Sequence, residues 1–210
     1  MKYGIFGLLA LFAAASAGAA PSIANLTPAD QKEVDRAESY INAVTILRAR
    51  FLQVAPDGST AEGTLSLSRP GKLRLDYDPP TPMIILANGD WLVYHDSQLD
   101  HTSYVDIDST PAALLVKKDL HLDKDGATVT GVVHKPGLVE ISAVKEKDPR
   151  QGKITLIFTE APYQLKQWLV TDAQGQTTTV SLYDPKTDVK FDPNIFRDRD
   201  PHVFEPLGNR

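Results

Sequence analysis

The chain has 210 residues and no cysteine, and its 27 Asp and Glu outnumber its 22 Lys and Arg for a net charge of −5. This composition excludes disulfides, thiolate metal sites and cysteine nucleophiles. An acidic chain without a basic stripe is also a poor nucleic-acid binder, and the length suits one domain with a sizeable hydrophobic core.

Residues 1–20 have the three parts of a secretory signal peptide. A lysine gives a positive start, an apolar run follows from Ile5 to Ala15, and Ala17-x-Ala19 offers a small-residue cleavage site. The run is too short for a membrane anchor, which needs roughly 20 apolar residues. We therefore expect an exported protein whose signal peptide is removed.

A helix is expected over residues 28–44. Thr27 followed by Pro28 is typical of an N-cap and a first helical residue. Apolar residues recur at helical spacing at Val34, Ala37, Ile41 and Val44. The opposite face carries Lys32, Asp35, Arg36 and Asn42. This pattern predicts a helix whose apolar face packs on a sheet.

From Ile46 onward the apolar period changes to two, which is typical of strands with one buried face. Within residues 61–80, two antiparallel strands are expected on either side of a break at Arg69-Pro70-Gly71. The other expected strands are 46–54, 83–87, 91–95, 101–107, 127–134, 138–145, 153–159, 164–172 and 176–183, with Asp184-Pro185 ending the last of them.

Two short helical segments interrupt the strands. Asp108-Ser109-Thr110-Pro111 predicts the cap of a helix from Ala112 to about Val116, which is either a plug or lid or ordinary core packing. Asp192-Pro193-Asn194-Ile195-Phe196 predicts one helical turn near the end.

The elements together predict a mainly β fold with helices (α+β). The expected architecture is a strongly curved antiparallel sheet, or incomplete β-barrel, of about 11 strands covered by a helical lid. We expect a single domain over residues 21–200 and a flexible tail over 201–210.

Residues that support catalysis are scarce. His95, His101, His121, His134 and His202 are scattered without the spacing of metal ligands. Nucleophile-elbow and phosphate-loop motifs are also missing from the sequence. We therefore expect neither an enzyme nor a bound cofactor.

What remains is apolar surface on the inner face of the curved sheet and on the short helix. The residues expected to line a hydrophobic cavity there are Phe51, Leu65, Leu67, Leu73, Leu75, Tyr77, Trp91, Val93, Leu114, Leu115, Phe158, Trp168 and Val170. An incomplete barrel of this size encloses more volume than two short helices fill. The alternative is that the helix over 28–44 simply packs the space.

Arg69 has the same parity as Leu65 and Leu67, so its guanidinium is expected at the rim of the apolar face. A charge in that place is costly unless it finds acceptors. We therefore expect Arg69 to be tethered to something across the opening.

The chain resembles the outer-membrane lipoprotein carrier family, the LolA-like periplasmic chaperones of double-membraned bacteria. The residues that carry the resemblance are Phe51-x-Gln53, Gly63, Arg69-Pro70, Pro79-Pro80, Leu86-x-Asn88-Gly89, Trp91-Leu92-Val93-Tyr94 and Asp192-Pro193-x-x-Phe196, in this order.

The resemblance implies a periplasmic carrier that holds the acyl chains of lipoproteins in a cavity and moves them from the inner to the outer membrane. The implied partners are an inner-membrane ABC-type release complex and an outer-membrane receptor, with the carrier a monomer. The family's rim arginine hydrogen-bonds the lid. By this resemblance we expect Arg69 to latch the segment near Ser109–Leu115, and Leu73 to lie at a mouth used in partner engagement.

An alternative interpretation of the sequence gives the protein the same fold and a different function. The chain would then be a periplasmic lipid-binding or lipoprotein-sensing module. Such sensors usually carry a second domain, for which this chain has no room. Mass spectrometry of a bound lipid separates the two readings.

Overall fold

The computed structural model describes residues 25–110, 113–122 and 126–197. The expected signal peptide over residues 1–20 and the expected tail over 201–210 lie outside the described residues.

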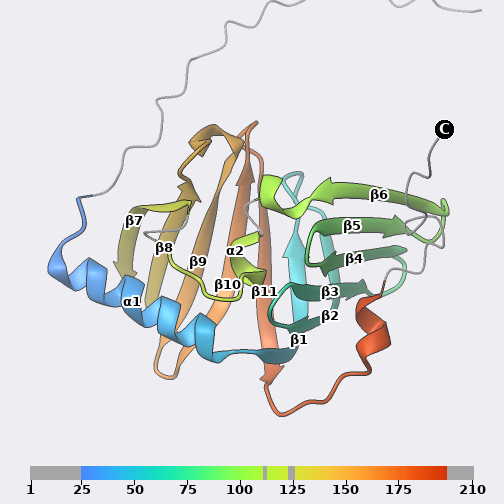
Figure 1. The fold of residues 1–210 in the computed structure, drawn as a ribbon, viewed down its shortest axis with the longest axis horizontal. Coiled ribbons are helices and arrows are strands. Elements are labelled where there is room, and N and C mark those ends of the chain that lie inside the picture. Colours follow the sequence, from blue (N-terminus) through green and yellow to red (C-terminus); the bar gives the residue numbers. More distant parts are fainter. Residues whose placement is uncertain (1–24, 111–112, 123–125, 198–210) are drawn as a thin grey trace, which may run out of the picture.

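The described residues form eleven strands in one open antiparallel sheet, in the order β6-β5-β4-β3-β2-β1-β11-β10-β9-β8-β7. Figure 1 shows β4 to β6 running across the direction of β8 to β11, so the sheet is strongly twisted and curved. The predicted fold class is confirmed. The strands are β1 Ile46–Val54, β2 Thr60–Ser68, β3 Lys72–Tyr77, β4 Met83–Asn88, β5 Trp91–Asp96, β6 His101–Asp106, β7 Ala127–Lys135, β8 Leu138–Lys145, β9 Gly152–Glu160, β10 Tyr163–Asp172 and β11 Thr177–Lys186.

The end of β11 departs from the sequence prediction. Asp184-Pro185 does not end the strand, which continues to Lys186. Asp184 has a positive φ of 51°, and the register with β1 shifts at this point. An irregularity of this kind leaves one position of the strand unpaired, so it accommodates Pro185, which has no N–H to donate.

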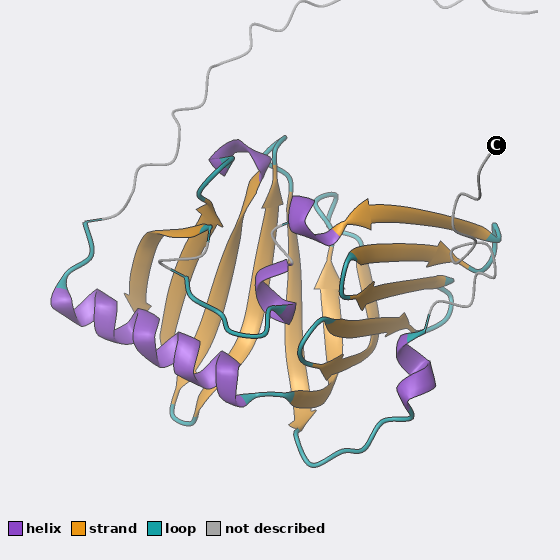
Figure 2. Cartoon of the chain, viewed as in Figure 1, coloured by secondary structure: helices purple, strands orange, loops and turns teal. Residues whose placement is uncertain are grey.

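Helix α1, Pro28–Ala43, confirms the first predicted helix. Thr27 and Asp30 form a capping box, in which the Thr27 side chain accepts from the Asp30 N–H and the Asp30 carboxylate accepts from the Thr27 N–H. The Thr27 hydroxyl and the Thr27 N–H both donate to the Asp30 carboxylate, and these two bonds lower the pKa of Asp30. Figure 2 shows α1 lying across strands β7 to β10, against which it buries Val34, Ala37 and Ile41.

Of the smaller helical elements, α2 and η3 lie on opposite faces of the sheet. α2, Ala113–Val116, is buried at all four residues and lies in the hollow of the sheet (Figure 2). The turn η1, Ile107–Ser109, precedes it, and η2, Pro149–Gln151, joins β8 to β9. Near the C-terminal end, η3, Pro193–Phe196, packs beside β3 and β4 and confirms the predicted helical turn.

The register identifies the inner face. Phe51 of β1 pairs with Gly63 of β2, and Leu47 pairs with Leu67. Leu67 pairs in turn with Leu73 of β3. These residues, other than Gly63, are buried in the main core cluster together with the buried residues of α1 and α2. In the described part of the chain, helices fall short of the length and hydropathy needed to cross a membrane.

Candidate functional site

The two helices and the central strands enclose a cavity of about 40 Å³ on the inner face. Because a water needs roughly 10–15 Å³ of such volume, this space admits a few waters and no larger ligand. The lining is apolar except for the tyrosine hydroxyl and the arginine guanidinium. It consists of Tyr40, Ile41, Val44, Leu47, Leu65, Leu67, Arg69, Leu73, Leu115, Leu165, Trp168 and Leu182.

Some of the cavity residues expected from sequence line this cavity, and others lie elsewhere in the same core. Leu65, Leu67, Leu73, Leu115 and Trp168 line it directly. The expected residues that belong to the same core cluster without lining the cavity are Phe51, Leu75, Leu114, Phe158 and, partly buried, Tyr77 and Val170.

Phe158 is part of an aromatic group at the α1 side of the sheet. Its ring lies edge-on to Tyr40 at 5.8 Å and stacks on Tyr163 at 5.0 Å between centroids. The guanidinium of Arg36 lies 3.9 Å from the centre of the Tyr163 ring. This group packs the middle of α1 on β9 and β10, next to the cavity wall formed by Tyr40.

Trp91 and Val93 do not line the cavity, and the sequence prediction is wrong for both. Val93 pairs with Leu86 on the outer face, where both contact Phe196 of η3. Trp91 has the same parity and is 44% exposed. The strand is apolar on both faces because η3 covers its outer side, so alternation within the strand did not identify the inner residues.

Arg69 lies at the meeting point of α1, α2 and the β2–β3 turn. Its Nε donates to the carbonyl oxygen of Lys117 at 2.9 Å, and its terminal nitrogens donate to the carbonyl oxygens of Ile41 and Lys117. A further bond joins it to Asn42 Oδ1 at 3.3 Å. Burial lowers the pKa of the Arg69 guanidinium, while nearby Asp119 acts in the opposite direction; an arginine nevertheless stays charged in a protein.

The expected tether of Arg69 is present, but its acceptors differ from the expected segment. They lie at Lys117, just after α2, and at Ile41 near the end of α1, and not within Ser109–Leu115. The reason is electrostatic: the last carbonyls of a helix have no partner within the helix, and they attract a cation.

A backbone contact reinforces this tether. The N–H of Gly71, in the β2–β3 turn, donates to the carbonyl oxygen of Val116 at 2.8 Å. Gly71 has a φ of 78°, a conformation that L side chains rarely adopt. The turn between β2 and β3 therefore holds two successive carbonyls at the C-terminal end of α2.

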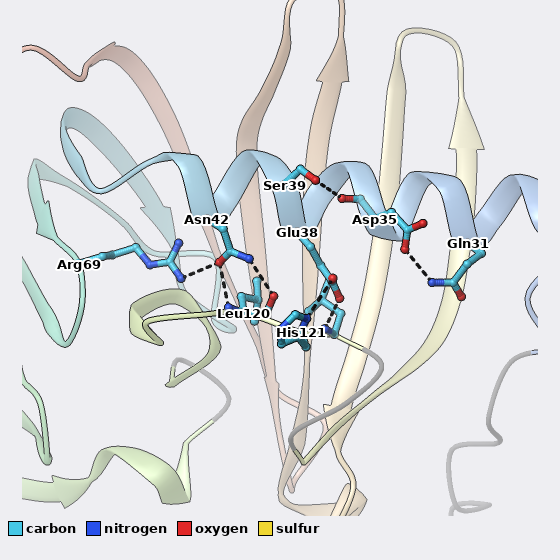
Figure 3. A network of polar contacts seen from close by, with 9 residues as sticks. Gln31, Asp35, Glu38, Ser39, Asn42, Arg69, Leu120 and His121 are labelled. Carbon is cyan, nitrogen blue, oxygen red and sulfur yellow. Dashed lines mark hydrogen bonds and ion pairs between the residues drawn. The ribbon is translucent and has the colours of Figure 1, made fainter.

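The segment that follows α2, residues 117–122, is bound along α1; we call it the strap (Figure 3). Asn42 donates from Nδ2 to the carbonyl of Leu120 at 3.0 Å and accepts its N–H on Oδ1 at 2.9 Å. Glu38 accepts the N–H of Leu122 at 2.6 Å. Its other carboxylate oxygen lies 3.5 Å from Nδ1 of His121.

The strap contacts give Asn42 a role that the sequence pattern does not reveal. Asn42 lies outside the apolar stripe, as predicted, and its side chain joins Arg69 and the strap (Figure 3). The contact links residues 78 positions apart in the chain. Helical periodicity shows which residues share a face and does not show which polar residue meets a distant backbone segment.

Comparisons with known proteins agree with this architecture. The family model described as "Outer membrane lipoprotein carrier protein LolA" matches residues 42–198. An outer-membrane lipoprotein carrier protein of Pseudomonas aeruginosa (strain UCBPP-PA14) is 30% identical over 183 residues, which cover 80% of this chain and 83% of that protein. One from Methylococcus capsulatus is 28% identical over 182 residues, covering 81% and 86%.

Among solved structures, a DUF1329 family protein from Desulfovibrio piger superposes with a TM-score of 0.52 at 10% identity. The match covers 79% of this chain and 95% of that chain. A likeness at this level of identity supports the fold alone.

Proposed function

The chain belongs to the outer membrane lipoprotein carrier protein family, LolA, and from this premise we propose that it carries lipoproteins across the periplasm with their acyl chains buried on the inner face of its sheet. The observation that carries the proposal is the apolar cavity beneath α1 and α2, with the half-buried Arg69 joining the end of α1 to the residue after α2. The carrier relatives support this role by name.

The proposed cycle starts from a closed form. A cavity of about 40 Å³ is far too small for an acyl chain, so α2 and the strap have to move away from the sheet before cargo enters. Each buried CH₂ contributes about 0.8 kcal/mol, and several chains would be held too tightly for release. Breaking the Arg69 and Gly71 contacts on opening offsets part of that gain, which makes the hand-over to a receptor possible.

The remaining elements of the proposal follow from the family and the N-terminal sequence. The signal peptide over residues 1–20 directs export and is removed, and residues 21–200 act as a single domain in the periplasm. An inner-membrane ABC-type complex supplies acylated lipoproteins, and an outer-membrane receptor accepts them from a monomeric carrier. No chemical step is needed, because cargo moves by differences in affinity.

The direct test is release of cargo. The exported protein is added to spheroplasts, and the supernatant is probed for a soluble complex with a lipoprotein, which is then mixed with outer membranes. A complex of about one to one that passes its cargo on is the expected result. No release, together with a different lipid that co-purifies with the protein, would favour the lipid-binding or sensing role.

Arg69→Leu tests the latch. Removing the guanidinium leaves the carbonyls of Lys117 and Ile41 without this donor, so the open form becomes easier to reach. We expect normal folding, an accumulating lipoprotein complex and a stalled transfer to outer membranes. Lys72→Leu, an exposed charge at the start of β3, is the matched control and should transfer normally. Normal transfer by Arg69→Leu would show that the latch is unnecessary.

A further inference from the structure

A second, larger cavity lies at the opposite end of the inner face. Its volume is about 470 Å³, and it shares no lining residue with the cavity beneath the helices. It is lined by Gln53, Ala55, Ser59, Thr60, Ala61, Tyr77, Thr81, Met83, Ile85 and Tyr94. This volume is within the range of roughly 300–1,000 Å³ that is typical of small-molecule sites.

The ring pair of Phe51 and Tyr77 lies between the two cavities. Along β1, Leu47 lines the first cavity and Gln53 the second, and Phe51 lies between them. The ring of Phe51 meets Tyr77 edge-on at 5.1 Å, and the Tyr77 hydroxyl donates to Gln53 Oε1 at 2.6 Å. The Tyr77 ring of this pair is thus held by a hydrogen bond to Gln53, and both residues line the second cavity.

The second cavity has a mixed lining that carries polar groups but no charge. The described residues that line it include two tyrosines, a glutamine and small hydroxyl side chains, with no acidic or basic group. Burial raises the pKa of Tyr77 to about 12 and also raises that of Tyr94, so both hydroxyls keep their protons at neutral pH. An ionic group placed here would lose hydration without gaining a counter-charge.

Two hydrogen-bond donors in this cavity lack an acceptor among the described residues. The Tyr94 hydroxyl has no bond to them, and Gln53 uses its oxygen for Tyr77, which leaves its amide N–H groups to donate. Donors that are free to bond a ligand, beside Met83 and Ile85, match a ligand that presents a carbonyl oxygen next to an apolar chain.

We propose that the second cavity binds the glyceryl ester of a neutral acyl lipid, with Tyr94 and Gln53 donating to the ester carbonyl. The inference rests on the proposed carrier function, in which this ester belongs to the diacylglyceryl group of a lipoprotein. The acyl chain then extends toward the cavity beneath α1 and α2 once the Phe51–Tyr77 pair moves aside.

The test measures binding of 1-monomyristoylglycerol to the exported protein by calorimetry, beside the ether analogue 1-O-tetradecylglycerol and the myristate anion. We expect the ester to bind more tightly than either. Tyr94→Phe should weaken ester binding about 3- to 10-fold, the range for one lost hydrogen bond, and leave the ether unchanged. Tyr183→Phe removes a hydroxyl that bonds Glu62 at an exposed site and is the matched control.

A second variant keeps the test decisive. Ala61→Leu places a larger apolar side chain in the cavity without removing a donor, and it should weaken binding of the ester and the ether alike, with circular dichroism showing a folded protein. If folded Ala61→Leu and Tyr94→Phe both bind the ester as the unmodified protein does, the proposed site is wrong.

Release of lipoprotein from spheroplasts, measured in parallel, separates the two proposals. If the unmodified protein releases lipoprotein but neither substitution changes ester binding, the proposed site is wrong and the carrier function stands. Tyr94-dependent ester binding without any release supports the site and overturns the carrier function.

Discussion

Gly63 of β2 lies where the inner face is most tightly packed. A Cβ at this position would lie 2.2 Å from the carbonyl oxygen of Asp76 and 2.6 Å from two ring atoms of Phe51. Both distances are far below van der Waals contact, and one of the neighbours is backbone, which cannot rotate away. Glycine at this position therefore lets the Phe51 ring lie flat over β2, which is the arrangement that forms the wall between the two cavities.

We predict that Gly63→Ala lowers the free energy of unfolding by about 1–3 kcal/mol, the usual cost of overpacking. Gly131→Ala in β7 is the control, because nothing lies within 4 Å of the Cβ position there, and it should change stability little. Urea denaturation followed by circular dichroism measures both. Equal stability of the two variants would show that β2 shifts without cost.

The raised pKa of Tyr77 predicts that the stability of the protein depends on pH in the alkaline range. Its folded pKa is raised to about 12 by burial, with smaller contributions from Tyr94 and from Gln53, the latter in the opposite direction. An unfolded tyrosine titrates near pH 10. Below pH 10 both states keep the proton; between about pH 10 and 12 the unfolded state loses its proton first, so the free energy of unfolding falls as pH rises.

By pH 11 this difference is about 1 kcal/mol. Tyr77→Phe removes it, although the variant is less stable at every pH because it lacks the bond to Gln53. Denaturation at pH 9 and pH 11 should therefore show a smaller loss for Tyr77→Phe than for the unmodified protein. Identical losses would mean that Tyr77 titrates normally in the folded state.

At the scale of elements, α2 and the strap hold their place through bonds made by other elements. A helix of four residues has no stability of its own, because nucleation costs more than its few hydrogen bonds return. α2 is held by burial of its four residues and by the turn between β2 and β3. The strap is held by Glu38 and Asn42 of α1. The contacts of α2 and the strap can consequently be broken without disturbing the sheet.

Asn42→Ala should loosen the strap selectively. The substitution leaves the N–H and carbonyl of Leu120 without their partner, at a cost of about 1–3 kcal/mol. Hydrogen exchange of the strap, residues 117–122, should accelerate by about ten-fold, with little change in the strands. Ser39→Ala is the matched control, since its hydroxyl bonds Asp35 within α1. If exchange in the strap of Asn42→Ala is unchanged, the strap is held in place by burial of its side chains and not by Asn42.

At the scale of the whole molecule, the sheet is joined at its centre by strands from opposite ends of the described chain. β1 pairs with β11, and from this pair the strands continue outward to β6 on one side and β7 on the other. One core cluster contains buried residues from both sides, such as Leu73 and Ile141. Because this main core extends over both sides, and the only other cluster among the described residues is the small one of Leu86, Val93 and Phe196, we expect the two sides to unfold together.

The two tryptophans report on the two sides separately. Trp168 of β10 is buried, and Trp91 of β5 is half exposed. In Trp91→Phe and in Trp168→Phe, the fluorescence of the remaining tryptophan should therefore follow the same urea transition as the circular dichroism of that variant. A fluorescence transition that precedes the circular dichroism transition in either variant would reveal an independently unfolding side.

Much of the fold follows from the sequence alone, because caps and periodicity are local properties. Thr27-Pro28 marks the start of α1. The alternation around Leu65, Leu67 and Leu73 identified both the strands and their buried face. At β11 the local rule failed, since an irregular register accommodates Pro185 in a way that composition does not reveal.

Contacts between distant segments were decided by the tertiary structure alone. η3, from the far end of the chain, covers the outer side of β4 and β5 and places Val93 away from the cavity. The Arg69 acceptor at Lys117 lies 48 residues further along the chain. Parity and charge placed Arg69 at a rim and required acceptors for it, but which carbonyls come within reach depends on how the helices pack. The volumes of the two cavities depend on the same packing, because a sequence pattern specifies faces and not the space between them.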